Sequence, residues 1–193
     1  MTASIYLIRH GTTLANRENR FAGRTAEPLH AEGVSQIREV GRKLQNIGLA
    51  AMYAGPLPRT RQSAEIIAAM CGIPFQVEED LTDICLPHWD GLAKDEIRQR
   101  YGPQYPAWQA SPESFTVPGC ETLLDVQQRA TGAVERIRRQ HAGEKVLLVT
   151  HLIVARCLML HYTGRELCHF RAIKVDNGDV VRLCQCHDGP PAA

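Results

Sequence analysis

The sequence predicts an α/β protein, a three-layer α/β/α sandwich with a mostly parallel central sheet. Short apolar runs, typical of buried strands, alternate along the chain with longer segments in which apolar residues recur at helical spacing. The composition, 44% hydrophobic and 22% charged over 193 residues, is that of a globular protein with a sizeable core. Because no internal repeat or linker divides the chain, we expect a single domain over residues 1–188 and a disordered tail at 189–193.

Strands are expected where short apolar runs end at turn residues. The first, at 4–9, stops at His10-Gly11, and the second, at 50–54, stops at Gly55-Pro56. A third is expected at 74–77. The continuous apolar run within 145–150 is typical of a central strand covered on both faces. The chain should end with strands at 172–175 and 180–184.

Helices are expected where apolar side chains line one face. Residues 31–47 are the clearest case, because Val34, Ile37, Val40, Leu44 and Ile47 recur at helical spacing. The same pattern predicts helices at 58–70, 121–140 and about 153–161. Residues 78–119 lack it, apart from a helix expected at 94–101, and they contain both tryptophans. We therefore expect this segment to be an insertion that forms a lid over a site.

The charge balance argues against binding through bulk electrostatics. Lys and Arg total 22 and Asp and Glu total 21, so nothing indicates a protein that binds nucleic acid or a membrane surface. The apolar stretch 152–160 is interrupted by Arg156, and the N-terminal apolar run is too short for a secretion signal. Seven cysteines, an odd number, favour reduced thiols in the cytoplasm. Cys184, Cys186 and His187 lack a second pair at zinc spacing, so we expect no metal.

The end of the first strand carries residues suited to phosphate chemistry. Imidazole is a good nucleophile near neutral pH, which makes His10 a candidate nucleophile. The guanidinium of Arg9 can hold phosphoryl oxygens through paired hydrogen bonds, and Gly11 lets the backbone approach an anion. A lone histidine after a strand is more often an ordinary polar surface residue, so this motif needs support from others.

Two further motifs supply that support. Arg59 lies in the first turn of an expected helix, where a positive charge opposes the helix dipole unless it serves an anion. His151 directly follows the apolar strand expected at 145–150. In α/β sheets, ligands bind at the carboxyl ends of the strands, so His10 and His151 should face one crevice although they are far apart in the sequence.

Taken together, these motifs resemble those of the histidine phosphatase superfamily, in the branch related to cofactor-dependent phosphoglycerate mutases. RHGTTLAN, residues 9–16, is similar to the RHG-E-T-x-x-N signature, and PLHAEGVSQ, residues 28–36, to the PLT-x-x-G-x-x-Q element. GPLPRTRQSA, residues 55–64, and VTHLIVAR, residues 149–156, are similar to SPLxRAxQTA and VSHGGxIR. The four motifs occur in the family's order.

The resemblance implies both a mechanism and a set of site residues. His10 would attack phosphorus to form a phosphohistidine, which water would then hydrolyse, with His151 as a second catalytic residue. Arg9, Arg59 and Asn16 would bind the phosphoryl oxygens. No cofactor and no metal ion are implied, and the expected partner is one small phosphate ester. A homodimer is left open.

The chain departs from the family pattern at two places. Asp83 stands where the family has a glutamate that protonates the leaving oxygen; its side chain is one methylene shorter, and we expect a backbone shift to make up the reach. The competing interpretation is an exposed loop aspartate in a slow enzyme, and His88 is a weaker candidate acid. Leu152-Ile153 replace a Gly-Gly pair and crowd the backbone after His151, which would narrow or reshape the pocket.

The leading hypothesis is a metal-independent phosphomonoesterase that acts on a small phosphorylated metabolite through phosphohistidine. A phosphoglycerate-type mutase is the alternative among enzymes, although such mutases resemble longer chains. Outside enzymes, the alternative is a catalytically weakened module that only binds phosphate, motivated by Asp83 and Leu152. Compact relatives include α-ribazole, phosphoserine and broad-specificity sugar-phosphate phosphatases, and the sequence does not select among these substrates.

Overall fold

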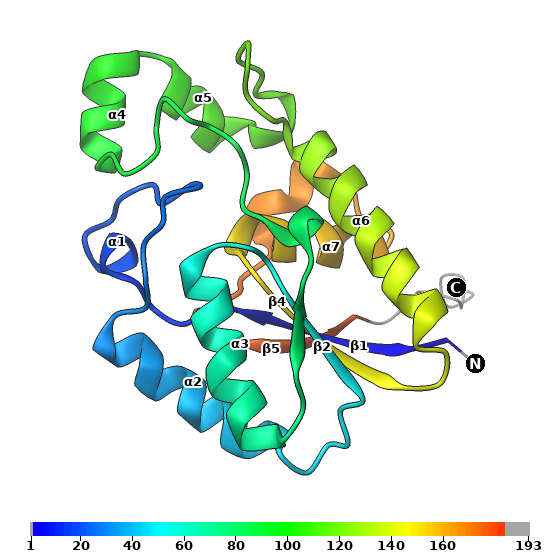
Figure 1. The fold of residues 1–193 in the computed structure, drawn as a ribbon. Coiled ribbons are helices and arrows are strands. Elements are labelled where there is room, and N and C mark those ends of the chain that lie inside the picture. The colour runs from blue at the N-terminus through cyan, green and yellow to red at the C-terminus, as the bar shows by residue number, and fades with distance from the viewer. Residues whose placement is uncertain (1, 184–193) are drawn as a thin grey trace.

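The computed structural model describes residues 2–183. Five strands in this range form one sheet in the order β3-β2-β4-β1-β5 (Figure 1). β1 to β4 run parallel, and β5 is antiparallel to its neighbour β1. The mostly parallel sheet expected from the sequence is therefore confirmed. The strands are β1 (Ser4–Arg9), β2 (Ala51–Ala54), β3 (Phe75–Val77), β4 (Lys145–Thr150) and β5 (Val180–Leu183).

Helices cover both faces of this sheet and complete the three layers. α2 (Ala31–Leu44) and α3 (Pro58–Cys71) pack on one face, and α6 (Leu123–Gln140) and α7 (Leu152–Tyr162) on the other (Figure 1). Along β4, Val146 and Leu148 belong to the core under α6 and α7, whereas Leu147 and Val149 belong to the core under α2 and α3. All four side chains are fully buried, which explains why the apolar run is continuous.

Residues 78–119, which the sequence predicts to be a lid and which we call the lid segment, form α4 (Lys94–Tyr101), α5 (Gln104–Ala110) and two short 3-10 helices at Glu79–Leu81 and Pro112–Ser114. It lies at the top of Figure 1, above α1 (Leu14–Arg17). Its aromatic residues belong to the core under α6 and α7: Trp89 is fully buried, and its ring packs against Tyr105, Trp108 and Phe115. Aromatic packing thus holds together a segment that has little helical periodicity.

The strand register brings the separate motifs to one edge of the sheet. Arg9 at the end of β1 pairs with Thr150 at the end of β4. His10 and His151 are the next residues on these neighbouring parallel strands, so both leave the sheet at the same edge. β2 pairs with β4 in the same direction and ends one residue before Gly55, at that edge too. The register therefore places His10 and His151 at one edge of the sheet, as the sequence predicts.

The prediction of a strand at 172–175 is wrong. Residues 172–175 were expected to form a strand, but a 3-10 helix covers Leu167–Ala172 and the following residues are extended without pairing. Their carbonyls are taken by arginine side chains instead. Arg156 Nε donates to the Ile173 carbonyl and Arg9 Nη1 to the Val175 carbonyl, each at 2.8 Å. An apolar run can therefore be extended without joining a ladder when side chains satisfy its carbonyls.

The remaining expected elements are present with slightly different ends. The helix expected at 31–47 ends at Leu44, and the helix expected at 121–140 begins at Leu123 because Thr122 and Asp125 cap it reciprocally. α1 and α5 were not expected, since each is too short to show periodicity. Cys184, Cys186, His187 and the expected tail lie outside the described residues. Within residues 2–183, no helix has the length and apolar character needed to cross a membrane.

A close approach between α2 and the loop after β1 requires glycine at position 33. A Cβ atom on Gly33 would lie 2.2 Å from the carbonyl oxygen of Thr12, which is main chain. Thr12 is also tied to α2, because its N–H and its hydroxyl both donate to Gln36 Oε1 at 3.0 Å. We expect Gly33→Ala to lower the free energy of unfolding by about 2 kcal/mol or more, measured by urea denaturation.

Gly132→Ala is the matched control. Gly132 lies inside α6, and the nearest atom to a Cβ there is the tip of the Arg136 side chain at 3.6 Å. The added methyl group fits, so the higher helix propensity of alanine should raise the free energy of unfolding by up to about 1 kcal/mol. A Gly33→Ala protein as stable as wild type would show that α2 can withdraw from the loop at no cost.

Candidate active site

His10 lies just past the end of β1 with its side chain almost fully buried. Its Nδ1 is 2.8 Å from the Gly11 carbonyl oxygen. Because a carbonyl only accepts, Nδ1 carries the proton and Nε2 of the neutral ring keeps its lone pair. The His10 carbonyl in turn accepts from the Asn177 amide (2.9 Å), which holds the main chain at this point. Nε2 is therefore the ring nitrogen of His10 whose lone pair is left for another group.

His151, Asp83 and Arg59 form a buried group beside His10. The rings of His10 and His151 meet edge to face with their centroids 5.2 Å apart. Asp83 follows the first 3-10 helix of the lid segment, and its Oδ2 lies 3.2 Å from Arg59 Nη2 and 3.6 Å from His151 Nδ1. Its Oδ1 accepts from the Ile84 N–H (3.0 Å). Arg59 enters from the first turn of α3 and is wholly buried.

Arg9 and Asn16 place further donors near His10. Arg9 is anchored by its bond to the Val175 carbonyl. Asn16 lies on α1, where its Oδ1 accepts from the Thr13 N–H and from the Asn177 amide, both at 3.1 Å. Since this oxygen is held from two sides, the amide nitrogen of Asn16 is the atom left to donate to a ligand.

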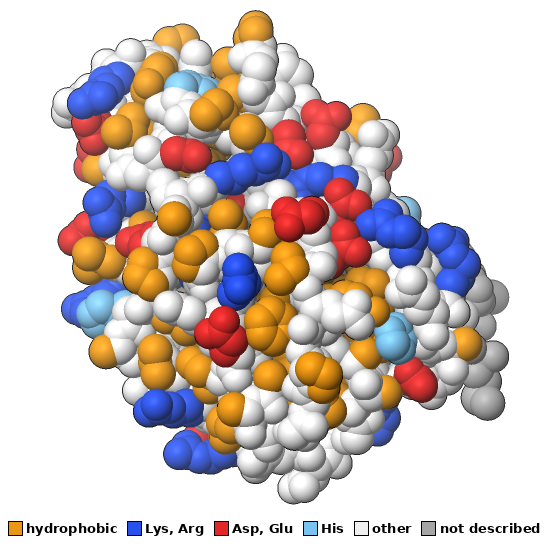
Figure 2. Space-filling view, in the orientation of Figure 1, with side chains coloured by type: hydrophobic (Ala, Val, Ile, Leu, Met, Phe, Trp, Pro, Cys, Tyr) orange, Lys and Arg blue, Asp and Glu red, His pale blue; other side chains and the backbone are white. Residues whose placement is uncertain are grey.

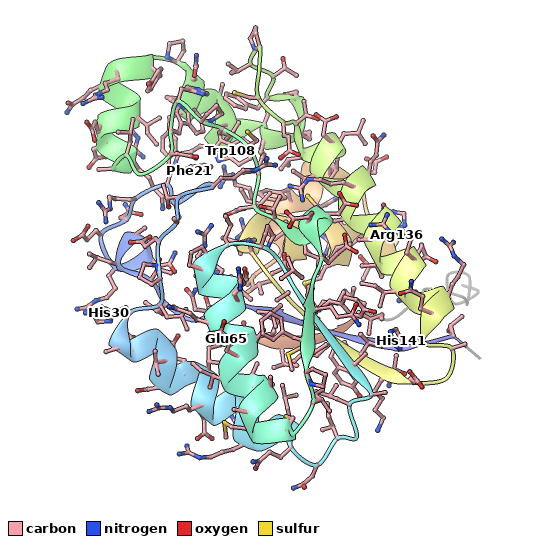
Figure 3. All side chains as sticks on the ribbon, viewed as in Figure 1. Phe21, His30, Glu65, Trp108, Arg136 and His141 are labelled. Carbon is pink, nitrogen blue, oxygen red and sulfur yellow. The ribbon has the colours of Figure 1, made fainter. Side chains whose placement is uncertain are left out.

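A cavity of about 190 Å³ opens on this group. Arg9, His10, Asn16 and Asp83 line it, whereas Arg59 and His151 are wholly buried next to it. Its outer wall is aromatic and basic. Figure 3 labels two of the wall residues, Trp108 on α5 and Phe21 beside it in this view. The other wall residues are Arg20, Ala22, Gly23, Lys94, Tyr105, Leu152, Ile153, Arg156, Phe170 and Arg171.

Several buried nitrogen atoms around His10 have no hydrogen-bond partner among the described residues. These are the Nε atoms of Arg9 and Arg59 and both ring nitrogens of His151. Buried polar atoms are nearly always paired, so a cluster of orphaned nitrogens on three side chains indicates a binding site for a polar ligand. Guanidinium donors suit an oxyanion such as a phosphoryl group.

The surroundings keep both imidazoles neutral and raise the pKa of Asp83. Burial, followed by the charges of Arg59 and Arg9, holds the pKa of His10 well below the usual 6.5. Burial and then Arg59 have the same effect on the pKa of His151. Burial also raises the pKa of Asp83 above the usual 3.8, although Arg59 opposes this. A neutral imidazole thus lies in one buried group with a carboxyl group whose pKa is raised.

The structure brings together every site residue singled out from the sequence: Arg9, His10, Asn16, Arg59, Asp83 and His151. His88, the weaker candidate acid, lies elsewhere, because its Nε2 bonds Gln104 (2.9 Å) and it does not line the cavity. Sequence reasoning missed Arg20, Lys94 and Arg171, because none of them belongs to a motif, although Lys94 begins the helix expected at 94–101. Only the fold reveals that they share a wall.

Comparison with known proteins identifies the family. Residues 5–192 match the histidine phosphatase superfamily (branch 1). The chain belongs to this superfamily. It is 29% identical over 188 residues to the probable phosphoglycerate mutase GpmB of Escherichia coli (strain K12 / DH10B), covering 93% of this chain and 83% of that protein. The resemblance noted in the sequence is confirmed, and so is the class of enzyme, a histidine phosphatase.

Solved structures of the family share the fold. YhfR of Bacillus stearothermophilus superposes with a TM-score of 0.90 at 34% identity, covering 93% of this chain and 90% of that one. A putative alpha-ribazole-5'-P phosphatase of Escherichia coli K-12 superposes with a TM-score of 0.85 at 21% identity, covering 96% and 92%. The α/β/α architecture of this histidine phosphatase is therefore that of its relatives.

Burial of two neutral histidines predicts how the stability of this histidine phosphatase depends on pH. Below pH 6.5 the unfolded chain binds a proton on His10 and on His151 while the folded protein does not, so the free energy of unfolding falls as pH falls. We expect His10→Asn to make this fall shallower by up to about 1.4 kcal/mol per pH unit. Urea denaturation at several pH values just below 6.5 measures how steeply the free energy of unfolding changes with pH in the wild type and in His10→Asn. Equal slopes in the two proteins would contradict a neutral His10.

Proposed function

We propose that the protein is a metal-independent phosphomonoesterase that hydrolyses a small phosphorylated metabolite through a phosphohistidine on His10. One observation supports this most strongly: the lone pair of a neutral imidazole stands among the orphaned nitrogens of Arg9, Arg59 and His151. Positioning and charge stabilisation supply most of the catalysis in phosphoryl transfer. A nucleophile built into an oxyanion site provides both.

The proposed reaction has two steps. First, His10 Nε2 attacks phosphorus, the bond to the ester oxygen breaks, and Asp83 gives its proton to that oxygen. Then the Asp83 carboxylate takes a proton from water, the water oxygen attacks phosphorus, and the bond to Nε2 breaks to release phosphate. Arg9, Asn16, Arg59 and His151 bind the nonbridging oxygens and offset their charge, a role that metal ions have in other phosphoryl-transfer enzymes.

The outer wall of the cavity supports a substrate with a second acidic group. Lys94, Arg156 and Arg171 form no ion pair with any residue of the part of the chain described by the structure. Burial and mutual repulsion lower the pKa of Lys94 and of Arg156, with Arg171 among the repelling charges in both cases. Cations gathered at this cost favour an anion between them. Arg9 and Arg59 already serve the phosphoryl group, so the outer cations are available for a carboxylate or a second phosphate.

The size of the cavity narrows the substrate further. Its volume of about 190 Å³ lies below the roughly 300–1,000 Å³ of sites for drug-sized ligands. Leu152 and Ile153 take up part of the wall. The relative GpmB is named for phosphoglycerate, a small phosphorylated carboxylic acid. We therefore propose a small phosphorylated acid as the substrate, in preference to a nucleotide-sized ester such as α-ribazole phosphate.

The cysteines support a cytoplasmic enzyme. The five within residues 2–183, Cys71, Cys85, Cys120, Cys157 and Cys168, are all free thiols. We infer that residues 1–188 act as one domain in that compartment, with the lid segment covering the site.

The reaction is tested by phosphate release from a panel that includes 3-phosphoglycerate, phosphoserine and glycerol 3-phosphate, with and without EDTA. We expect the wild type to release phosphate at a rate that EDTA does not change, because donors of the chain replace a metal ion. His10→Ala should be slower by about a thousandfold or more, since no phosphohistidine can form.

Other outcomes would identify the alternatives. A wild type no faster than His10→Ala on every ester would support a module that only binds phosphate. Loss of activity in EDTA would remove the metal-free mechanism. Isomerisation of 3-phosphoglycerate in the presence of a bisphosphate primer, without net phosphate release, would support the mutase suggested by the name of GpmB.

The second acidic group is tested by removing one outer cation. We expect Arg171→Met to lower kcat/KM for 3-phosphoglycerate by about tenfold and for glycerol 3-phosphate by less than about twofold, because a charge-assisted bond to the carboxylate is lost. Arg100→Met is the control, since Arg100 lies on α4 with Lys94 but pairs with Glu96 and is not in the wall. Equal losses on both esters would contradict a carboxylate at Arg171.

A further inference from the structure

We propose that Arg129, together with Glu121, positions the main chain of residues 80–85 so that the carboxyl group of Asp83 reaches the leaving oxygen. This inference rests on the proposed role of Asp83 as the acid. Its side chain is one methylene shorter than the glutamate of the family pattern. The carboxyl group is therefore placed by the main chain more than by side-chain reach, and proton transfer requires hydrogen-bond distance.

Arg129 clamps the main chain that leads to Asp83. It lies on α6 with a side chain 15% exposed. Its Nη1 donates to the carbonyls of Asp80 (2.6 Å) and Thr82 (2.8 Å), and its Nη2 donates to the carbonyl of Asp83 (3.2 Å). One guanidinium thus holds three carbonyls within four consecutive residues. Such a contact fixes the path of the chain rather than one side chain.

Glu121 holds the same segment on the other side of Asp83. Its carboxylate pairs with Arg129 through both oxygens, at 2.9 and 3.2 Å. Oε2 also accepts from the Cys85 N–H (2.8 Å), and the Glu121 N–H donates to the Cys85 carbonyl (2.9 Å). The peptide groups before and after Asp83 are therefore tied to one ion pair.

Arg24 adds a bond from a third part of the chain. Its Nε donates to the Asp83 carbonyl (3.0 Å) and its Nη2 to Glu121 Oε2 (2.9 Å). The neighbouring carbonyls of Gly23 and Thr25 accept from Arg59 at 2.5 and 3.0 Å. One loop thus contacts both the proposed acid and a proposed phosphate ligand, which couples their positions.

The helix that carries Arg129, α6, is firmly held in the fold. The reciprocal cap of Thr122 and Asp125 fixes the start of α6 directly after Glu121. Val126, Ala130 and Val134 of the same helix are fully buried in the core. Because α6 is packed on the sheet, it holds Arg129 at a fixed place, and Arg129 in turn holds the main chain of the lid segment.

Arg129 is a positioning residue and not a ligand of the substrate. Its Nε, both N–H of Nη1 and both N–H of Nη2 are already used by the contacts above. It also does not line the cavity. Figure 2 shows basic and acidic side chains side by side along the boundary between the lid segment and α6, where Arg24 pairs with Glu121 and Arg136 with Glu78 and Asp80.

The test compares kcat/KM for 3-phosphoglycerate and for p-nitrophenyl phosphate. The alkoxide of the first needs a proton to leave, whereas nitrophenolate leaves without one. Arg129→Gln should lower kcat/KM for 3-phosphoglycerate at least about tenfold more than for p-nitrophenyl phosphate, because a misplacement of about 1 Å can cost this much. Asp83→Asn gives the reference for complete loss of the acid. If Arg129→Gln lowers kcat/KM by the same factor for both esters, the proposal is overturned.

A double mutant separates positioning from general destabilisation. If Arg129 acts through Asp83, then adding Arg129→Gln to Asp83→Asn should leave the ratio of the two kcat/KM values unchanged. If Arg129→Gln lowers this ratio as much in the Asp83→Asn protein as in the wild type, the proposal is overturned. Arg136→Gln is the matched control, because Arg136 lies on the same helix and bonds the side chains of Glu78 and Asp80 but no carbonyl of residues 82–83. In Arg136→Gln, the ratio of kcat/KM for 3-phosphoglycerate to kcat/KM for p-nitrophenyl phosphate should change by less than about twofold.

A surface variant covers the case in which Arg129→Gln does not fold. Arg24 is 36% exposed and also donates to the Asp83 carbonyl, so Arg24→Gln should shift the ratio in the same direction by about threefold. No shift in Arg24→Gln and in Glu121→Gln would overturn the proposal. Failure of the proposed function is distinguishable, because wild type would then release phosphate from neither ester.

Discussion

The parallel pairing of β1 with β4 sets where both imidazoles stand. Each strand delivers one histidine at its carboxyl end, and the register of Arg9 with Thr150 decides that the two rings meet. A slip of one residue would turn every side chain of a strand to the other face, and close packing opposes this because each core is fitted to its own residues of β4, Val146 and Leu148 on one side and Leu147 and Val149 on the other. The packing of apolar residues therefore fixes the chemistry at the strand ends.

Arginine has two opposite functions around this edge. Arg129 has every N–H bonded to carbonyls and to Glu121, so it works as a fixed part of the scaffold. Arg9 and Arg59 each keep a buried Nε without a partner, although Arg59 also pairs with Asp83, and Lys94 and Arg171 share one wall without an acidic partner among the described residues. An arginine with every N–H bonded has a structural role, whereas arginines with unpaired donors beside a cavity can still bind a ligand.

Much of the fold and the inner site follows from local sequence, whereas the outer site does not. Buried strands such as 145–150 and amphipathic helices show their pattern directly, and the motifs after the strands identify His10, Arg59 and His151. Residues 172–175 have the apolar character of a strand, but their carbonyls are claimed by Arg156 and Arg9 from distant segments. Lys94 and Arg171 join the site only through tertiary packing, and no local pattern can report a contact across the fold.

The place of β1 in the sheet has a consequence for how the protein is made. Among the described strands, the one that precedes His10 is synthesised before all others, yet it lies between β4 and β5, which are synthesised after the rest. Asn177, which holds the His10 carbonyl, also belongs to this final part. A nascent chain therefore cannot complete the surroundings of His10 before β4, Asn177 and β5 have been made, so the RHG motif reaches its folded environment long after its own synthesis.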